Sequence, residues 1–389
     1  MTAFEVPRTH RSPIRTGLVI HGPEVIDSGK LVEIAQALQV LGPLHVLTGG
    51  TMARVAALDS PLGASIDTAQ KMHTSDALTY FSNKDAIVLA NCGKTIITGT
   101  VFGQMVSSRV QRSVIQVERL GASDGRTLLW RGIDGDKFPL VHYVAQYLAD
   151  NLALKLQEIQ KKNVLVYHKD GFDLRYVHGA KRGECILVDG KVVGTVVDEQ
   201  VIIAAQNGSI VDIKGVAIKE HGLAKIGYVD LEKAYVKTGY LRRNNKVECS
   251  SKATFPVRNL ERGEVAFINH AADRTLESVK EKTVCAITIG DDTTAICSDI
   301  LSRVGIPIVG ITDGDADGIY RATCKAHGSV VILLKDESDD EIGYLLEKNN
   351  VIAARDYTLE EVVEAVITFL HRSHVNFMVH VEGQTNPSS

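Results

Sequence analysis

Three dipeptides that favour tight hairpin turns constrain the middle of this 389-residue chain more than any other feature. Asp170-Gly171, Asp189-Gly190 and Asn207-Gly208 each separate two short runs that are rich in apolar residues. Both central residues of the preferred two-residue hairpin turn need a positive φ angle, which Asp, Asn and Gly tolerate best. The spacing therefore predicts three hairpins within a small antiparallel β domain, which we place at residues 163–245.

The segments on either side of this domain follow a different pattern. Short apolar strands end in glycine-containing loops and lead into helices, at 17–22, 44–50 and 86–95 before the β domain and at 284–290 and 306–311 after it. Strands that alternate with helices are typical of an open parallel sheet. We therefore predict an α/β fold with two Rossmann-like parallel-sheet parts, at 17–162 and 246–382, flanking the β domain. A flexible arm is expected at 1–16, a tail at 383–389, and long helices over 140–160 and 318–327.

The composition is that of a globular protein and excludes several classes. Hydrophobic residues make up 44% of the chain and charged residues 23%, which argues against a disordered or fibrous protein. Lys and Arg number 43 against 47 Asp and Glu, a balance that argues against a nucleic acid bound along its backbone. No apolar run approaches the roughly 20 residues of a membrane span, and the N-terminus lacks the apolar core of a signal peptide. Six cysteines without a C-x-x-C spacing fit a reducing compartment. We therefore expect a cytoplasmic protein without a membrane or nucleic-acid partner, and leave its oligomeric state open.

The sharpest chemical signal is an acidic loop directly after the predicted strand 306–311. Asp313, Asp315 and Asp317 lie within five positions, and such carboxylates repel one another unless solvent or a cation neutralises them. The carboxyl end of a strand in a parallel sheet is also where such sheets bind ligands. The loop therefore favours Mg²⁺ that carries a phosphate group, over the alternative of a solvated turn that caps the next helix. An EF-hand is excluded because Cys324 stands where the calcium loop needs a bidentate Glu.

A second loop, 290–294, also lies between a predicted strand and a predicted helix. Gly290 and the hydroxyl groups of Thr293 and Thr294 offer a phosphate cradle at the start of that helix. Asp291 and Asp292 either add ligands to the acidic loop, because consecutive strands of such a sheet lie close together, or simply cap the helix. The acidic stretch 335–340 after the next strand is interpreted as a solvated helix start, from which one carboxylate is able to reach the same site.

The N-terminal α/β part offers a looser anion site. Gly93-Lys94-Thr95 follows a predicted strand, but Val88 occupies the position where a Walker A loop requires glycine. Lys94, Thr95 and the backbone amides are therefore expected to form, at most, a simpler anion site or an ordinary loop.

Further residues suggest weaker candidates. Gly99 and Gly103 indicate either a close backbone approach or merely a turn. His21 ends the first strand and lines the same crevice, where a lone histidine is more often structural than catalytic. Arg242, at the end of the β domain, is a candidate partner for phosphate or for the acidic loops, or a surface charge.

The acidic pattern resembles the Toprim domains of primases, topoisomerases and some nucleases. In those domains an acidic residue after one strand works with a D-x-D motif after a later strand to hold Mg²⁺. Asp291 or Asp292 stands for the first acid here, in place of the Toprim Glu, and Asp313 with Asp315 stands for the pair. The resemblance covers only residues 284–334 and implies similar metal chemistry by analogy.

Motifs spread over nearly the whole chain resemble an uncharacterised family of methanogenic archaea, domain of unknown function 2117. They include His21-Gly-Pro23, Gly49-Gly-Thr-Met52, Lys219-Glu-His-Gly222, Gly290-Asp-Asp-Thr-Thr294 and Asp313-Gly-Asp315. The resemblance implies an archaeal cytoplasmic protein and assigns no reaction to it.

Together these features predict a Mg²⁺-dependent enzyme that acts on a nucleotide or another phosphorylated small molecule. The expected catalytic residues are Asp313, Asp315 and Asp291, and the expected metal ligands are Asp313, Asp315, Asp317 and Asp292. The expected phosphate-binding residues are Gly290, Thr293, Thr294, Lys94, Thr95 and Arg242. The alternatives are a non-catalytic nucleotide or metabolite sensor and a Toprim-like protein that processes nucleic acid.

Overall fold

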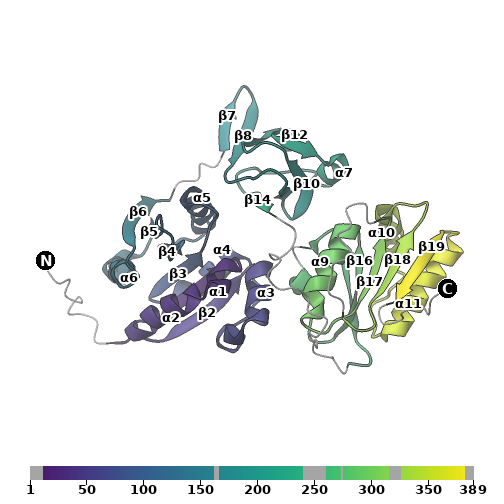
Figure 1. Ribbon diagram of the computed structural model, residues 1–389, viewed down its shortest axis with the longest axis horizontal. Coiled ribbons are helices and arrows are strands. Elements are labelled where there is room, and N and C mark those ends of the chain that lie inside the picture. The colour runs from purple at the N-terminus through teal and green to yellow at the C-terminus, as the bar shows by residue number, and fades with distance from the viewer. Residues whose placement is uncertain (1–11, 162–165, 240–259, 273–274, 315–325, 382–389) are drawn as a thin grey trace. The chain divides into compact units, whose positions relative to one another are not determined.

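The computed structural model describes residues 12–161, 166–239, 260–272, 275–314 and 326–381. The chain divides into two compact units, Met1–Gly239 and Tyr240–Ser389. The first unit contains an α/β part and an antiparallel β part, and the second is a further α/β part, which confirms the predicted fold class (Figure 1). The helix predicted over 318–327 and the predicted tail lie almost wholly outside the described residues.

A six-stranded sheet forms the α/β part of the first unit. Its strands are β1 (Thr16–His21), β2 (Leu44–Gly49), β3 (Ala86–Asn91), β4 (Val114–Glu118), β5 (Arg126–Arg131) and β6 (Lys155–Gln160). They lie in the order β2-β1-β3-β4-β5-β6, and every pair is parallel except β4 with β5. The predicted parallel sheet is therefore present, with one antiparallel pair that the sequence pattern did not indicate.

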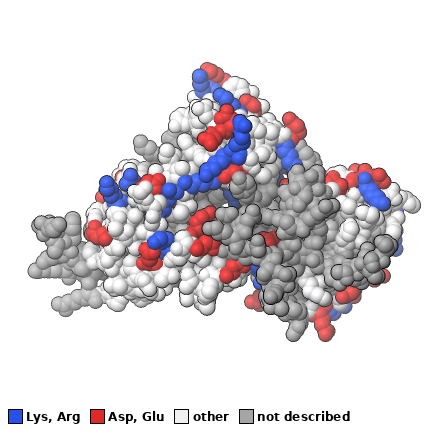
Figure 2. All heavy atoms as spheres, viewed as in Figure 1, with Lys and Arg blue, Asp and Glu red and all other residues white. Residues whose placement is uncertain are grey.

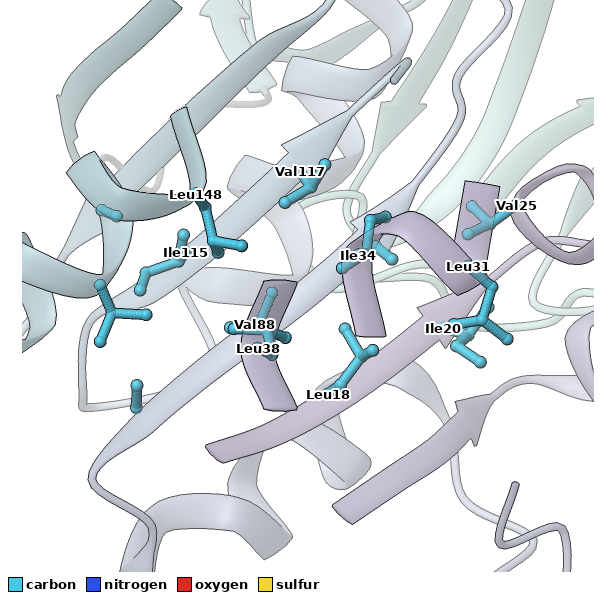
Figure 3. Packing of buried hydrophobic residues seen from close by; sticks show 14 of the residues in the cluster. Leu18, Ile20, Val25, Leu31, Ile34, Leu38, Val88, Ile115, Val117 and Leu148 are labelled. Carbon is cyan, nitrogen blue, oxygen red and sulfur yellow. The ribbon is translucent and has the colours of Figure 1, made fainter. Parts of the chain in front are cut away.

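Helices cover both faces of this sheet because its side chains alternate between the two faces. The helices are α1 (Glu24–Asp27), α2 (Lys30–Leu41), α3 (Thr51–Asp59), α4 (Thr74–Tyr80), α5 (Ile96–Ser107) and α6 (Phe138–Asn151), with short 3₁₀ turns at Pro61–Ser65, Phe81–Asn83 and Gly135–Lys137. Leu18 and Ile20 of β1 pack with Ile34 of α2 and Leu148 of α6 (Figure 3). Val19, one position along, lies in the core on the side of α4 and α5.

The prediction of a single long helix over 140–160 is wrong. Helix α6 ends at Asn151, Ala153 has a φ angle of 53°, and Lys155–Gln160 forms the edge strand β6 beside β5. Strand β6 has no buried residue, because it lies at the edge of the sheet and carries a single partly buried apolar side chain on each face, Leu156 and Ile159. Its polar sequence therefore lacks the apolar alternation that identifies a strand.

The β part of the first unit contains the three predicted hairpins. Its strands are β7 (Val166–Lys169), β8 (Phe172–Val177), β9 (Cys185–Val188), β10 (Lys191–Val196), β11 (Val201–Gln206), β12 (Ser209–Lys214), β13 (Val216–Ile218) and β14 (Val236–Gly239), with the short helix α7 (Glu220–Ala224). They form two antiparallel sheets, β13-β10-β9-β14 and β12-β11-β8-β7. Asp170, Asp189 and Asn207 have φ angles of 53°, 47° and 52°, as the predicted turns require.

The second unit contains a five-stranded sheet in the order β15-β16-β17-β18-β19. The strands are β15 (Glu264–Asn269), β16 (Thr283–Ile289), β17 (Ile308–Thr312), β18 (Val330–Leu334) and β19 (Phe377–Val381), and the helices are α8 (Thr275–Ser278), α9 (Asp291–Ser302), α10 (Asp339–Lys348) and α11 (Leu359–Arg372). Strands β15 to β18 are parallel and only β19 is antiparallel. The carboxyl ends of four neighbouring strands therefore lie along one edge.

The described surface carries mixed charges. On the face that Figure 2 shows, Lys and Arg side chains lie beside Asp and Glu side chains, in keeping with the nearly balanced counts of 43 and 47. Among the described residues, no helix combines the length and the apolar character needed to cross a bilayer.

Candidate functional site

Three carboxylates from three strand ends meet at the carboxyl edge of the sheet in the second unit. Asp291 begins α9 after β16, Asp313 follows β17, and Asp339 begins α10 after β18. Each offers an oxygen atom that lies within 4.8 Å of the others. They meet because β16, β17 and β18 are adjacent and parallel, so their carboxyl ends lie side by side. The sequence pattern predicts Asp291 and Asp313 individually, and it places the third carboxylate only within the stretch 335–340.

Crowding and burial raise the pKa values of two of these carboxylates, Asp339 and Asp291. Burial, followed by the charges of Asp313, Asp291 and Asp340, raises the pKa of Asp339 to about 7. Burial, with the charges of Asp313 and Asp292, also raises the pKa of Asp291. Because Asp339 is only 5% exposed, solvent screens it poorly. Carboxylates this close need a shared proton or a cation, and their hard oxygen atoms suit Mg²⁺.

A second group of side chains shares Asp339. The Nε2 atom of His270, which follows β15, lies 3.3 Å from Oδ1 of Asp340 and 3.8 Å from Oδ1 of Asp339. The Nδ1 atom of His270 donates to Oδ1 of Asn269, which turns Nε2 toward the carboxylates. One atom from each of His270, Asp339 and Asp340 also lies within 4.8 Å of the others. His270 was not predicted as a site residue, because the sequence pattern indicated no strand at 264–269.

Gly290 connects the two groups. Its φ angle is 100°, and its amide donates to the carbonyl oxygen of Ile311 at 3.0 Å, which joins the end of β16 to β17. A Cβ atom at this position would lie 2.8 Å from Nε2 of His270. Glycine is therefore required both by the backbone conformation and by the nearby imidazole. Helix α9 begins directly afterwards, and the amides of a first helical turn attract phosphate.

The two threonines of the predicted phosphate cradle are buried. Thr293 is 5% exposed and Thr294 is fully buried. The Thr294 hydroxyl lies 3.0 Å from the Thr288 hydroxyl, and its methyl group packs over Gly310. The Thr294 side chain thus points into the core beneath α9, and we leave it out of the proposed site.

The remaining predicted residues of the acidic loops divide into two groups. Asp292 lies on the first turn of α9, where its charge contributes to the raised pKa of Asp291. Asp315, Asp317 and Arg242 lie outside the described residues, so their predicted roles stay predictions.

In the first unit, Lys94 joins the α/β part to the β part. Its Nζ atom lies 2.6 and 2.8 Å from the two carboxylate oxygens of Glu184, and it donates to the carbonyl oxygen of Thr238 at 3.1 Å. Thr95 caps α5 in a reciprocal pair of hydrogen bonds with Thr98. Both residues have structural partners here, and their anion-binding role stays a prediction.

A polar network that sequence analysis missed lies at the carboxyl edge of the first unit's α/β sheet. Glu118, fully buried at the end of β4, accepts hydrogen bonds from Nδ2 of Asn91 at 2.7 Å, from Nε2 of Gln116 at 2.6 Å and from the amide of Gly93 at 2.6 Å. Burial raises the pKa of Glu118 to about 7, and these three donors oppose the rise. The Oδ1 atom of Asn91 in turn lies 2.7 Å from Nδ1 of His21.

Two glycines on α5 allow the helix to approach this network. A Cβ atom at Gly99 would overlap the carboxylate of Glu118, and one at Gly103 would overlap the amide of Gln116. The close backbone approach that these glycines suggested is therefore confirmed.

Replacing Gly103 by alanine is expected to lower the free energy of unfolding of the first unit by about 2 kcal/mol, the usual cost of overpacking. The new methyl group must displace Gln116, which accepts a hydrogen bond from Nε1 of Trp130 at 2.7 Å. Urea unfolding followed by the fluorescence of this single, fully buried tryptophan measures the change. Ile97→Ala, at a 58%-exposed position of the same helix, is the control, with an expected change below about 0.5 kcal/mol. Equal stabilities for both variants would contradict the close packing.

The matches to known proteins extend over both units of the chain. The family model described as "Uncharacterized protein conserved in archaea" matches residues 18–352, a range that contains both groups of converging side chains. A protein of Methanocaldococcus jannaschii, named "Uncharacterized protein MJ0065", is 42% identical over 359 residues, which cover 91% of this chain and 96% of that protein. No solved structure matches the chain. The chain therefore belongs to the archaeal family known as domain of unknown function 2117.

Proposed function

We propose that the protein is a Mg²⁺-dependent enzyme that acts on a nucleotide or another phosphorylated small molecule. The observation that supports this most is the convergence of Asp291, Asp313 and Asp339 from three strand ends within 4.8 Å. Helix capping does not account for it, because Gly290 occupies the N-cap of α9 and the Ser338 side chain caps α10. Among the described residues, no lysine or arginine forms an ion pair with these three carboxylates, so they suit the binding of a cation.

The donor set fits a hard divalent ion. Asp291, Asp313 and Asp339 would hold it, and the first turn of α9 would receive a phosphate group of the substrate. Bound Mg²⁺ supplies charge neutralisation on phosphoryl oxygens. His270, beside Asp339 and Asp340, would donate a hydrogen bond to the phosphate or accept a proton near it.

Calorimetric titration with Mg²⁺ tests the metal site. We expect saturable binding to the wild type and at least about tenfold weaker binding to Asp313→Asn, which removes one ligand charge. Asp356→Asn is the matched control, because Asp356 is exposed and precedes Tyr357, which pairs with Gly263 at the opposite edge of the sheet. Equal heats for the wild type and Asp313→Asn would contradict the proposal.

Product analysis distinguishes an enzyme from a sensor. Nucleoside di- and triphosphates and sugar phosphates are incubated with the protein and Mg²⁺, and phosphorus NMR follows each compound. The proposal expects release or transfer of a phosphoryl group, abolished in Asp313→Asn. Binding without turnover of any compound would favour the sensor and contradict the enzymatic proposal.

A further inference from the structure

The carboxyl edge of the first unit's α/β sheet is a second place where polar side chains converge. Strands β2 and β3 lie on opposite sides of β1, so the chain crosses over β1 between them. Open α/β sheets bind ligands beside the carboxyl ends of the strands at such a crossing. His21 ends β1 and Asn91 ends β3, so both residues lie at this position.

Hydrogen bonds determine which nitrogen of His21 carries the proton. Glu118 accepts from Nδ2 of Asn91, which leaves Oδ1 of Asn91 as the acceptor toward His21. The Nδ1 atom of His21 therefore donates, and Nε2 of the neutral ring keeps its lone pair. Within the described residues, Nδ1 is the only ring nitrogen of His21 that makes a hydrogen bond. The Phe102 ring, stacked at 3.8 Å between centroids, fixes the plane of the imidazole.

The imidazole stays neutral in neutral solution. Burial lowers the pKa of His21 to about 4; the hydrogen bond to Asn91 opposes this change, and the positive charge of Lys237 on β14 adds to it. Glu118 is the nearest acidic group in the network, two hydrogen bonds away through Asn91. The half-buried His21 therefore presents an acceptor nitrogen rather than a cation.

The network is more elaborate than the stability of the fold requires. Burying the carboxylate of Glu118 costs several kcal/mol before its hydrogen bonds form, and a well-packed apolar replacement is often as stable. Trp130 and Gln116 extend the network. Gln116 accepts a hydrogen bond from Trp130 and donates one to Glu118, so its side-chain amide has a single favourable orientation. The result is a fixed orientation of Asn91 and, through it, of His21.

Positive charge lies near the same edge. Lys237 lies on β14, and its positive charge is one of the causes that lower the pKa of His21. Helix α3 begins at Thr51, after strand β2, and its N-cap Gly50 provides no side-chain cap, so the partial positive charge of the helix start remains. Apart from Gly50 and its two chain neighbours, no atom of the described residues lies within 4 Å of the place where a Cβ of Gly50 would be, so there is room beside this helix start.

We propose that this edge is a ligand-binding site of the first unit, in which Nε2 of His21 accepts a hydrogen bond from a hydroxyl group of a small anionic molecule. Lys237 and the start of α3 would stabilise the anionic group of the ligand. The ligand class is a hydroxylated phosphate ester or carboxylate. Asn91 and Glu118 are positioning residues that act through His21.

Carbethoxylation of His21 by diethyl pyrocarbonate, followed by peptide mass spectrometry, tests whether the lone pair of Nε2 is available to a small molecule. The reagent attacks unprotonated imidazole, so the rate for N-acetylhistidine, with its ordinary pKa of about 6.5, falls about tenfold from pH 7.5 to pH 5.5. For His21 we expect less than a twofold change in rate over the same range, because a pKa of about 4 keeps the ring neutral at both pH values. A tenfold fall, or no reaction in the folded protein, would overturn the proposal.

Protection from the same reagent tests the ligand. Glycerol 3-phosphate and glycerate carry a hydroxyl group and an anionic group, whereas glycerol and inorganic phosphate each lack one of these features. We expect millimolar glycerol 3-phosphate or glycerate to slow the modification of His21 at least fivefold, and the other two compounds to have little effect. The phosphate and carboxylate probes separate the two anion classes. Absence of protection by either hydroxylated anion would overturn the site.

Variants distinguish residues that bind the ligand from residues that have only a structural role. Lys237→Gln should abolish protection while leaving the modification rate unchanged, whereas Lys233→Gln, at an 83%-exposed side chain of the same segment, should preserve protection. Asn91→Leu should weaken protection at least fivefold while His21 remains reactive. Asp313→Asn, in the acidic site of the second unit, should preserve protection. Equal protection in Lys237→Gln and Lys233→Gln would contradict the proposed role of Lys237.

Discussion

Replacing Asp339 by asparagine is expected to abolish Mg²⁺ binding and, in metal-free solution, to stabilise the second unit. Asp339 is 5% exposed, and burial together with Asp313, Asp291 and Asp340 raises its pKa to about 7. At pH 8 Asp339 is therefore mostly ionised, and its buried charge lowers the free energy of unfolding. Removing that charge should stabilise the metal-free unit by about 2 kcal/mol. Thermal unfolding with and without Mg²⁺ measures both effects. The wild type should gain stability from Mg²⁺, and the variant should not respond.

The pH dependence of stability follows from the same shift. The folded state keeps the Asp339 proton to about pH 7, whereas the unfolded chain releases it near pH 4, its ordinary pKa. Stability that is present below about pH 4 should therefore be lost as the pH rises through about 7, and this loss should be smaller in Asp339→Asn. Asp356→Asn, at the opposite edge of the sheet, is the control that should keep the wild-type profile. A metal-free Asp339→Asn less stable than the wild type at pH 8 would contradict this account.

Replacing Lys94 by alanine is expected to lower the free energy of unfolding of the first unit by about 3 kcal/mol, because it leaves a buried charge without its partner. The Glu184 side chain is 4% exposed, and Lys94 lies 2.6 Å from it. The amide of Lys181 also donates to Glu184 at 3.0 Å, but it brings no net charge. Urea unfolding followed by Trp130 fluorescence measures the loss.

Two further variants test this explanation of the Lys94→Ala effect. Lys94→Met combined with Glu184→Leu should recover most of the lost stability, since an apolar pair of similar volume replaces the buried ions. Lys137→Ala removes an equally long side chain that is 50% exposed and lies 3.9 Å from Asp85, and it should change stability by less than about 0.5 kcal/mol. If Lys94→Ala matched Lys137→Ala, the ion pair would contribute little.

Local sequence was sufficient where a residue type dictates backbone geometry. The Asp-Gly and Asn-Gly turns give the hairpins because few other residues accept positive φ angles at both positions. Thr358 and Glu361, three positions apart, likewise form the reciprocal hydrogen bonds that begin α11. Asp291 and Asp313 were found because each follows an apolar strand of a parallel sheet.

Long-range pairing was the part that the sequence did not show. His270 follows β15, whose place beside β16 depends on the rest of the sheet. Glu118 and Asn91 meet only because β3 and β4 are neighbours, and an isolated Glu at a strand end has no distinctive pattern. The carboxylate partner of Lys94 was not predicted, because Glu184 comes 90 positions later in the chain. In each case the chemistry comes from contacts between distant segments.

The contacts of Lys94 and of the segment before β14 affect how the protein is best dissected into fragments. The Tyr235 hydroxyl forms a hydrogen bond with the Ser75 hydroxyl at 3.1 Å. The guanidinium group of Arg109 lies 4.3 Å from the centre of the Tyr235 ring. A fragment truncated after α6 and β6 would expose these surfaces, together with Lys94, to water. Expression trials and limited proteolysis of this family should therefore favour a cut near residue 239 over one near residue 162.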